Sequence, residues 1–378
     1  MSTLPEVNVH QRLSLAIAVS DLRYSAGSLL DAIEHPRSWP FTQWATMVAF
    51  EAQKHVRDVH QCEVEAGWEE MVASAARHGG KFFDGRRRQL DNVVEDFREL
   101  TEATHRAFYP HDRRGRFFDF LRNDLSVVGD GREVVLTNVS GHFMVGLPPD
   151  RGIDMQSWGP HLDTLGAGIG QITRAFLGNS AAEVSEHGSR SSTSLKWWDG
   201  KVAEVRSAIF GGELDTELAM AVISIHSTVQ AARGWAHAEC CADCSDASLK
   251  HRFVVLHHAI RSLHQLSPRS EQLGRTAQKH LGGIVESTAL QLLVEQPFRR
   301  LRNGWFHLGL GDIESKLPAD PSLTAPVAAY TGMDTEAFSA AVHRGLDEVS
   351  WRVGDWLNEP GADGTTLFKR LRLVDVTR

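Results

Sequence analysis

The chain has 378 residues, of which 42% are hydrophobic and 23% are charged, and its formal net charge is −8. This composition is that of an ordinary globular protein, and the length fits two domains of roughly 150–200 residues. It excludes a disordered chain and argues against a surface that is basic throughout, as non-specific DNA binding would require.

Apolar residues recur every three or four positions along most of the chain, which is the pattern of helices that bury one face. In the first such stretch Leu13, Ile17, Leu22 and Leu29 keep this step. Proline and glycine mark several helix ends. The helices that we expect span residues 9–33, 41–64, 80–109, 116–125, 158–177, 215–237, 249–266, 270–307 (continuous or broken) and 334–357.

Residues 133–147 interrupt this pattern. Two runs rich in Val, Leu and Thr, 133–139 and 142–147, predict a β-hairpin with its turn at Ser140-Gly141. Residues 178–199 are rich in Ser and Gly, which indicates a linker or loose loop. We therefore expect a mainly α fold of two related helical bundles, residues 1–180 and 200–378, with a small β-hairpin insertion in the first.

Relatedness of the two halves is suggested by a short shared motif. The first half contains Arg122-Asn123 and the second contains Arg302-Asn303, each within Leu-Arg-Asn, downstream of an aromatic residue and upstream of a glycine. A weak internal duplication accounts for this, although coincidence between two amphipathic helix ends does so as well.

The strongest local signal is the stretch Leu301-Arg-Asn-Gly-Trp-Phe-His-Leu-Gly309. Its Arg302, Asn303 and His307 resemble the Arg-polar-x-x-x-His signature of the HEPN superfamily. The resemblance is firm over this motif and looser over residues 200–357. In the first half, Val127 stands where His307 would, so Arg122-Asn123 would mark a degenerate copy without the histidine.

The resemblance implies a helical bundle and a metal-independent endoribonuclease that acts as a homodimer, in defence against phage or in stress response. RNA is the implied partner, and no cofactor or metal is implied. Many HEPN-like domains only bind, so the alternative is a non-catalytic module that binds RNA or a small ligand or mediates dimerisation. The Val127 copy favours that alternative.

The residue types suit metal-free RNA cleavage. Histidine can take or give a proton near neutral pH, and arginine is a permanent planar donor for the charge that develops on phosphorus. Asn303 could orient either group by hydrogen bonds. Residues five apart on an ideal helix point about 140° apart, at 100° per residue. Arg302 and His307 can therefore share a cleft only at a frayed helix end or across a dimer axis.

The same spacing occurs elsewhere by chance in a chain with 19 histidines. Rival pairs are Arg106/His111, Arg252/His257 and Arg275/His280. The polar Asn303 directly after the arginine, and Gly309 and Gly311 beyond the helix, favour the Arg302 pair. Arg302 and His307 could also be structural, as cations that stabilise a helix C-terminus.

Four other groups of residues, rich in cysteine, histidine, tryptophan or arginine, have both a structural and a functional explanation. Cys240, Cys241 and Cys244 form at most half of a zinc site. The histidine-rich helix of His251, His257, His258 and His264 has no metal-binding pattern, although one of these rings could line the RNA cleft. Trp197, Trp198, Trp235, Trp305 and Trp351 could stack bases, but more often such residues fill cores. Basic runs such as Arg299, Arg300 and Arg302 are usually solvated helix faces.

Location follows from what the sequence lacks. No stretch approaches 18 apolar residues without charges, so we expect no membrane-spanning helix. Residues 1–6 have neither the basic region nor the apolar core of a secretion signal. We therefore expect a cytoplasmic protein.

Overall fold

The protein is mainly α-helical with one small antiparallel sheet, which confirms the predicted fold class. The computed structural model describes residues 8–30, 39–61, 69–81, 89–108, 123–147, 155–178, 195–210, 214–234, 245–269, 274–359 and 366–374. Its main helices are α1 (Val9–Leu30), α2 (Trp39–His60), α3 (Glu69–Lys81), α4 (Gln89–Phe108), α7 (Met155–Leu177), α8 (Val202–Ile209), α9 (Thr216–Gly234), α10 (Ser245–Leu266), α11 (Gly274–Val285), α13 (Gln296–Phe306) and α15 (Thr335–Asn358).

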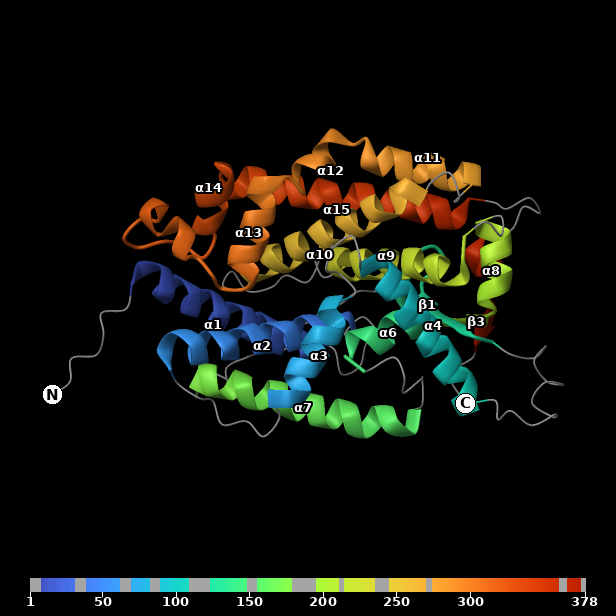
Figure 1. Cartoon of the computed structure of the whole chain (residues 1–378), viewed down its shortest axis with the longest axis horizontal. Coiled ribbons are helices and arrows are strands. Elements are labelled where there is room, and N and C mark those ends of the chain that lie inside the picture. The colour runs from blue at the N-terminus through green and yellow to red at the C-terminus, as the bar shows by residue number, and fades with distance from the viewer. Residues whose placement is uncertain are drawn as a thin grey trace.

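The helices are arranged in three tiers (Figure 1). In this view α1, α2, α3 and α7 lie at the bottom, α9 and α10 cross the middle, and α11 and α15 lie at the top with the short α12 (Thr288–Leu292) and α14 (Ala325–Thr331). Helix α13 descends on the left from the top tier toward the bottom one. The middle helices are buried along nearly their whole length because both neighbouring tiers cover them. The start of α10 and the end of α13 lie close to the N-terminal helices, as the contacts of Lys250 with Asp21 and of His307 with Glu51 show.

The sheet draws strands from both predicted halves of the chain. It has the order β2-β1-β3-β4, with β1 (Leu125–Gly129), β2 (Val134–Thr137), β3 (Lys196–Gly200) and β4 (Arg372–Val374). Successive neighbours are antiparallel. Core side chains of both halves also form one hydrophobic cluster. The division into two related bundles stays a prediction, but the halves share a sheet and a core.

The hairpin lies earlier in the chain than predicted. Its strands are β1 and β2, and its turn is held by Asp130, whose Oδ1 accepts from the backbone N–H groups of Arg132 and Glu133, both at 2.8 Å. The predicted second strand, 142–147, is instead mostly helix α6 (Asn138–Met144). Thr137 and Ser140 explain the difference, because each side chain accepts from the other's backbone N–H in a capping box that starts a helix.

Other boundaries also differ from the prediction. The helix expected at 270–307 is broken into α11, α12 and α13, which was one of its two predicted forms. Helix α3 and the short elements α14 and η8 (Gly311–Lys316) form where no helix was predicted. The end of the predicted 178–199 linker is strand β3. Most of the helix predicted at 116–125 lies outside the described residues, and Leu125 begins β1.

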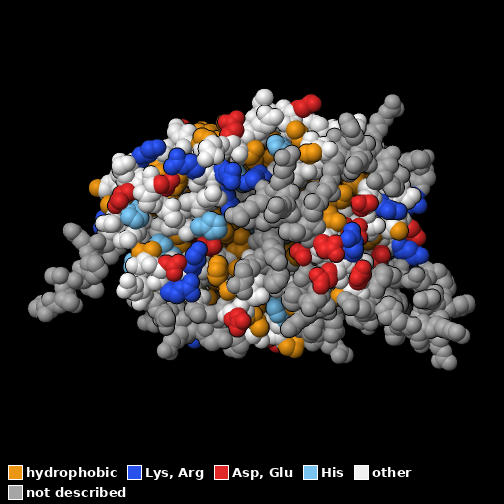
Figure 2. Space-filling model, viewed as in Figure 1, with side chains coloured by type: hydrophobic (Ala, Val, Ile, Leu, Met, Phe, Trp, Pro, Cys, Tyr) orange, Lys and Arg blue, Asp and Glu red, His pale blue; other side chains and the backbone are white. Residues whose placement is uncertain are grey.

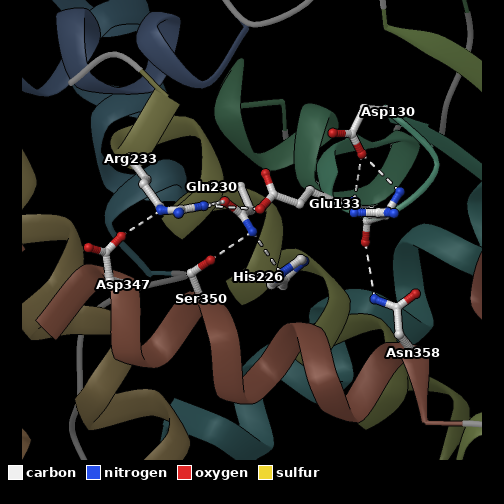
Figure 3. A network of polar contacts seen from close by, with 9 residues as sticks. Asp130, Glu133, His226, Gln230, Arg233, Asp347, Ser350 and Asn358 are labelled. Atoms are coloured by element: carbon white, nitrogen blue, oxygen red, sulfur yellow. Dashed lines mark hydrogen bonds and ion pairs between the residues drawn. The ribbon is translucent and has the colours of Figure 1, made fainter. Parts of the chain in front are cut away.

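A polar network ties the hairpin to α9 and α15 (Figure 3). Arg233 of α9 donates from Nε to Asp347 at 2.7 Å and from Nη1 to Glu133 at 3.0 Å. Gln230, one turn earlier, donates to Ser350 Oγ at 2.8 Å and to His226 Nε2 at 3.1 Å. Burial lowers the pKa of His226 to about 4, so the ring is neutral at pH 7.

Candidate active site

Helix α13 carries the predicted motif and ends within it. Pro297, in its first turn, needs no intrahelical partner for a backbone N–H. The last helical residue is Phe306, and Leu308 adopts a left-handed conformation with φ of 57°. The Gly309 N–H donates to the Gly304 carbonyl at 3.0 Å, which is a Schellman closure. His307 is therefore the C-cap of the helix, free of the 140° separation that an unbroken helix would impose.

The turn that follows α13 is held by the first tier. Ser14 of α1 donates from Oγ to the Leu308 carbonyl at 2.9 Å in a buried contact. Trp44 of α2 packs on Phe306, with ring centroids 5.8 Å apart. The left-handed backbone of Leu308 is costly for a residue with a β-carbon. These contacts and the burial of the Leu308 side chain, which is 4% exposed, offset that cost.

Arg302 lies between two histidines. Its Nε and Nη2 donate to His258 Nε2 of α10 at 3.1 and 2.7 Å. Its Nη1 donates to Asn303 Oδ1 at 2.9 Å and approaches His307 Nε2 at 3.4 Å, a long hydrogen bond. Guanidinium groups only donate, so both Nε2 atoms act as acceptors and carry no proton. These acceptors are uncharged, and they fix the arginine without cancelling its charge.

His307 is oriented by a carboxylate from the other end of the chain. Glu51 of α2 places Oε1 2.8 Å from His307 Nδ1, and its side chain is 9% exposed. An ionised carboxylate accepts only, so Nδ1 carries the ring proton and Nε2 keeps a lone pair. The imidazole is 42% exposed. This Glu–His pair has the arrangement of a general base held by an acidic partner.

A pocket of about 550 Å³ opens over this face of α13. Its lining residues are His257, His258, Arg261, Arg299, Arg300, Arg302, Asn303, Gly304, His307, Gly309, Asp312 and Tyr330. Four are arginines, three are histidines, and Asp312 is the one carboxylate among these described lining residues. The pocket is therefore strongly basic within a chain of net charge −8.

Charge is unevenly distributed over the face shown in Figure 2. Several Lys, Arg and His side chains lie in its left half, and a cluster of Asp and Glu side chains lies on the right over α4, with a few Lys and Arg side chains beside it. Exposed Glu95, Glu99 and Glu102 belong to that acidic helix. The basic lining of the pocket attracts an anion, whereas the carboxylates of α4 repel one.

His257 lines the pocket as a buried ring with no hydrogen-bond partner among the described residues. It is 1% exposed, and neither ring nitrogen has a hydrogen bond. Burial lowers the pKa of His257 to about 3, with smaller contributions from Arg302, Arg261 and Arg299. A neutral imidazole in this place offers one N–H donor and one acceptor. Buried polar groups normally have a hydrogen-bond partner, and the described part of the chain provides none for this ring.

On the other side of the pocket, Arg300 and Tyr330 are already bonded to Asp312. Asp312 accepts from the Tyr330 hydroxyl and from Arg300 Nη2, the latter at 2.8 Å. Burial alone would raise the pKa of Asp312, but these two hydrogen bonds outweigh it and lower the pKa below its usual value. The Tyr330 hydroxyl lies where a β-carbon on Gly304 would sit, which explains the glycine in the motif. The carboxylate thus neutralises Arg300 locally.

Arg302, Asn303 and His307 are therefore brought together on one pocket. Sequence reasoning missed Glu51, which lies 256 positions before His307 with no local signal, and it named His258 only as one member of a histidine-rich helix. Of the rival pairs, Arg252 and His257 have no hydrogen bond to each other, and Arg252 instead contacts His343 at 2.7 Å. The other pairs include side chains outside the described residues.

The supposed first copy has a different local structure. Val127 is a fully buried residue of strand β1, whereas His307 is an exposed helix cap. Arg122 lies outside the described residues. The duplication stays a prediction, and the Val127 position offers no group to a site.

Two weaker signals stay outside the pocket. Cys240, Cys241 and Cys244 lie beyond the described residues, and among the described ones no group of three or more His, Cys, Asp or Glu side chains could hold a metal ion. Trp198 and Trp305 are buried core residues, and Trp351 is 60% exposed. No described tryptophan lines the pocket, and Trp235 is outside the described part.

Searches of family models, curated proteins and solved structures find no match to this chain. Within the described residues, no helix is both long and apolar enough to span a membrane.

Proposed function

We propose that this protein is a metal-independent endoribonuclease of the HEPN type. The observation that carries the proposal is the chain of contacts from Glu51 through His307 to Arg302, which opens into a basic pocket of about 550 Å³. It supplies a proton acceptor with a fixed tautomer next to a permanent cation.

The chemistry follows from these positions. His307 Nε2 takes the proton of a ribose 2′-hydroxyl, whose oxygen then attacks the adjacent phosphorus. Arg302 stabilises the negative charge that develops on the phosphoryl oxygens, and the Glu51 carboxylate stabilises the imidazolium that forms. Asn303, already bonded to Arg302, orients the guanidinium. The products are a 2′,3′-cyclic phosphate and a 5′-hydroxyl.

Expulsion of the 5′-oxygen also needs a proton. One chain places one exposed histidine at this motif, so we propose that His307 of a second chain in a homodimer, or the His307 imidazolium itself, donates it. A cytoplasmic role in phage defence or stress response rests on the family resemblance.

The test is cleavage of a fluorescently labelled single-stranded RNA in the presence of EDTA. His307→Ala should reduce the rate at least 100-fold, since general acid–base catalysis contributes roughly 10²–10⁴-fold. His161→Ala is the matched control, because His161 lies on α7 outside the pocket and should retain full activity. Equal cleavage by His307→Ala and the unmodified protein would refute the proposal.

A second candidate is a non-catalytic module that binds RNA or a small anionic ligand. The observation that favours it is that His258, Asn303 and His307 of the same chain already hold Arg302. This candidate predicts RNA binding that His307→Ala leaves intact, with no cleavage by either protein.

A further inference from the structure

The pocket extends beyond Arg302, Asn303 and His307 onto α10. The residues of this extension have no role in the proposed cleavage reaction. His257 and Arg261 are four residues apart on α10, so they lie on one face of the helix. Arg299 faces them from the first turns of α13, and all three line the pocket. None of the three takes part in the chemistry proposed above.

We propose that His257, Arg261 and Arg299 form a second phosphate subsite, which binds the phosphate that neighbours the scissile one in a single RNA strand. The inference rests on the proposed function in one respect, namely that the bound strand is RNA. The proposed substrate is an RNA strand with a second phosphate next to the cleaved bond, and not a dinucleotide whose only phosphate is the one that is cleaved.

Three observations support this assignment. The buried His257 ring has no hydrogen-bond partner, and a phosphate oxygen would accept its N–H. Two arginines from two different helices converge on the same space, which suits a tetrahedral anion with several acceptor oxygens. The cationic surroundings exclude a metal ion, and the polar lining excludes an apolar ligand.

Arg300 provides a contrast on the same helix. It carries the same charge as Arg299 and lines the same pocket, but Asp312 pairs with it at 2.8 Å. A phosphate at Arg300 would have to displace that carboxylate or approach it against repulsion. The control for Arg299→Gln is Arg174→Gln, which removes the same charge from an exposed position of α7 outside the pocket.

The binding experiment uses the full chain with His307→Ala and a fluorescent single-stranded RNA of about 20 nucleotides, titrated at several salt concentrations. Arg299→Gln and Arg261→Gln should each weaken binding about tenfold and lower the slope of log Kd against log salt by about 0.7, the value for one lost contact to single strands. Arg174→Gln should stay within twofold. Equal effects of Arg299→Gln and Arg174→Gln would overturn the subsite.

A second experiment locates the subsite relative to the cleaved bond. We expect a dinucleotide with an added terminal phosphate, on the 5′ or on the 3′ side, to be cleaved with about tenfold higher kcat/KM than the same dinucleotide without it. Arg299→Gln should abolish this gain. Inorganic phosphate should compete with the phosphorylated dinucleotide and not with the bare one. Identical kcat/KM for all dinucleotides would contradict the proposal.

Failure of the two proposals can be told apart. Salt-dependent binding that responds to Arg299 and Arg261, without cleavage of any RNA, would remove the nuclease and keep the phosphate subsite. Cleavage that depends on His307, with binding indifferent to Arg299 and Arg261, would do the reverse.

Discussion

Two arginine-centred clusters in this protein show opposite uses of the same side chain. Arg233 bonds to the carboxylates of Glu133 and Asp347 and joins the hairpin to α15 (Figure 3). Arg302 bonds to His258 and Asn303, which are uncharged, and lines an open basic pocket. The first cluster neutralises its arginine in a partly exposed ion-pair network. The second fixes the position of its arginine and leaves the charge for a ligand.

A structural ion pair and a prepared site differ in what the charge of the arginine stabilises. Carboxylates next to an arginine lower the energy of the protein alone, although exposed pairs of this kind contribute only about 0–1 kcal/mol each. Neutral acceptors give less Coulomb attraction, but the cation then stabilises negative charge that arrives with a substrate or develops in a transition state. Four predictions test whether the two clusters differ in this way.

The largest effect is expected from replacing each arginine by lysine. Arg302→Lys should reduce RNA cleavage by about 10²–10³-fold, because an ammonium cannot reproduce the planar fork that His258 and Asn303 hold. Arg233→Lys should leave cleavage unchanged. Initial rates with EDTA present measure both. Similar losses from both variants would erase the distinction.

A smaller loss of activity is expected when the partner of His307 is changed. Glu51→Gln keeps an acceptor for Nδ1 but removes the charge that stabilises the imidazolium, so kcat should fall roughly 10–100-fold with little change in KM. Glu70→Gln, at an exposed position of α3, is the control. Proportional changes in KM with constant kcat would show that Glu51 serves binding and not catalysis.

In the network around Arg233, we expect a substitution to change the stability of the protein and not its activity. Gln230 is buried and bonded to both His226 and Ser350. Gln230→Ala leaves these groups unsatisfied and opens a cavity, so the free energy of unfolding in urea should fall by about 2–3 kcal/mol. The exposed Gln171→Ala should change it by less than about 0.5 kcal/mol. Cleavage at 25 °C should be the same in both variants.

The smallest expected effect is on the dependence of stability on pH. Burial lowers the pKa of His226 from 6.5 to about 4, so the unfolded chain binds a proton at a higher pH than the folded protein does. Stability should therefore fall as the pH drops from 6.5 toward 4, by at most about 1.4 kcal/mol per pH unit for this ring. His226→Gln should reduce the loss between pH 6 and pH 5 by about 1 kcal/mol. An unchanged slope in urea titrations would contradict the assignment.

The sequence was sufficient for features that depend on local pattern. The step of apolar residues predicted α1, α2, α7, α9, α10 and α15 to within a few residues at most ends. Arg302, Asn303 and His307 were found because they share one short motif with a helix end beside it. The capping box of Thr137 and Ser140 was visible but was interpreted as a turn, which misplaced the hairpin.

Features that depend on distant contacts could not be found in this way. Glu51 acquires its role only when α2 packs beside the end of α13, and nothing in its neighbours distinguishes it from other helical glutamates. The sheet is similar, because β3 and β4 are short and pair with partners far away in the chain. A glycine was expected just after the end of α13, and Gly309 does lie there. The left-handed position itself is occupied by Leu308.

The contact between Glu51 and His307 spans 256 positions of the chain, and this has a consequence during translation. At roughly 5–20 residues per second, residue 51 is synthesised about 13–51 s before residue 307. A nascent chain therefore cannot form this contact until residue 307 has left the ribosome.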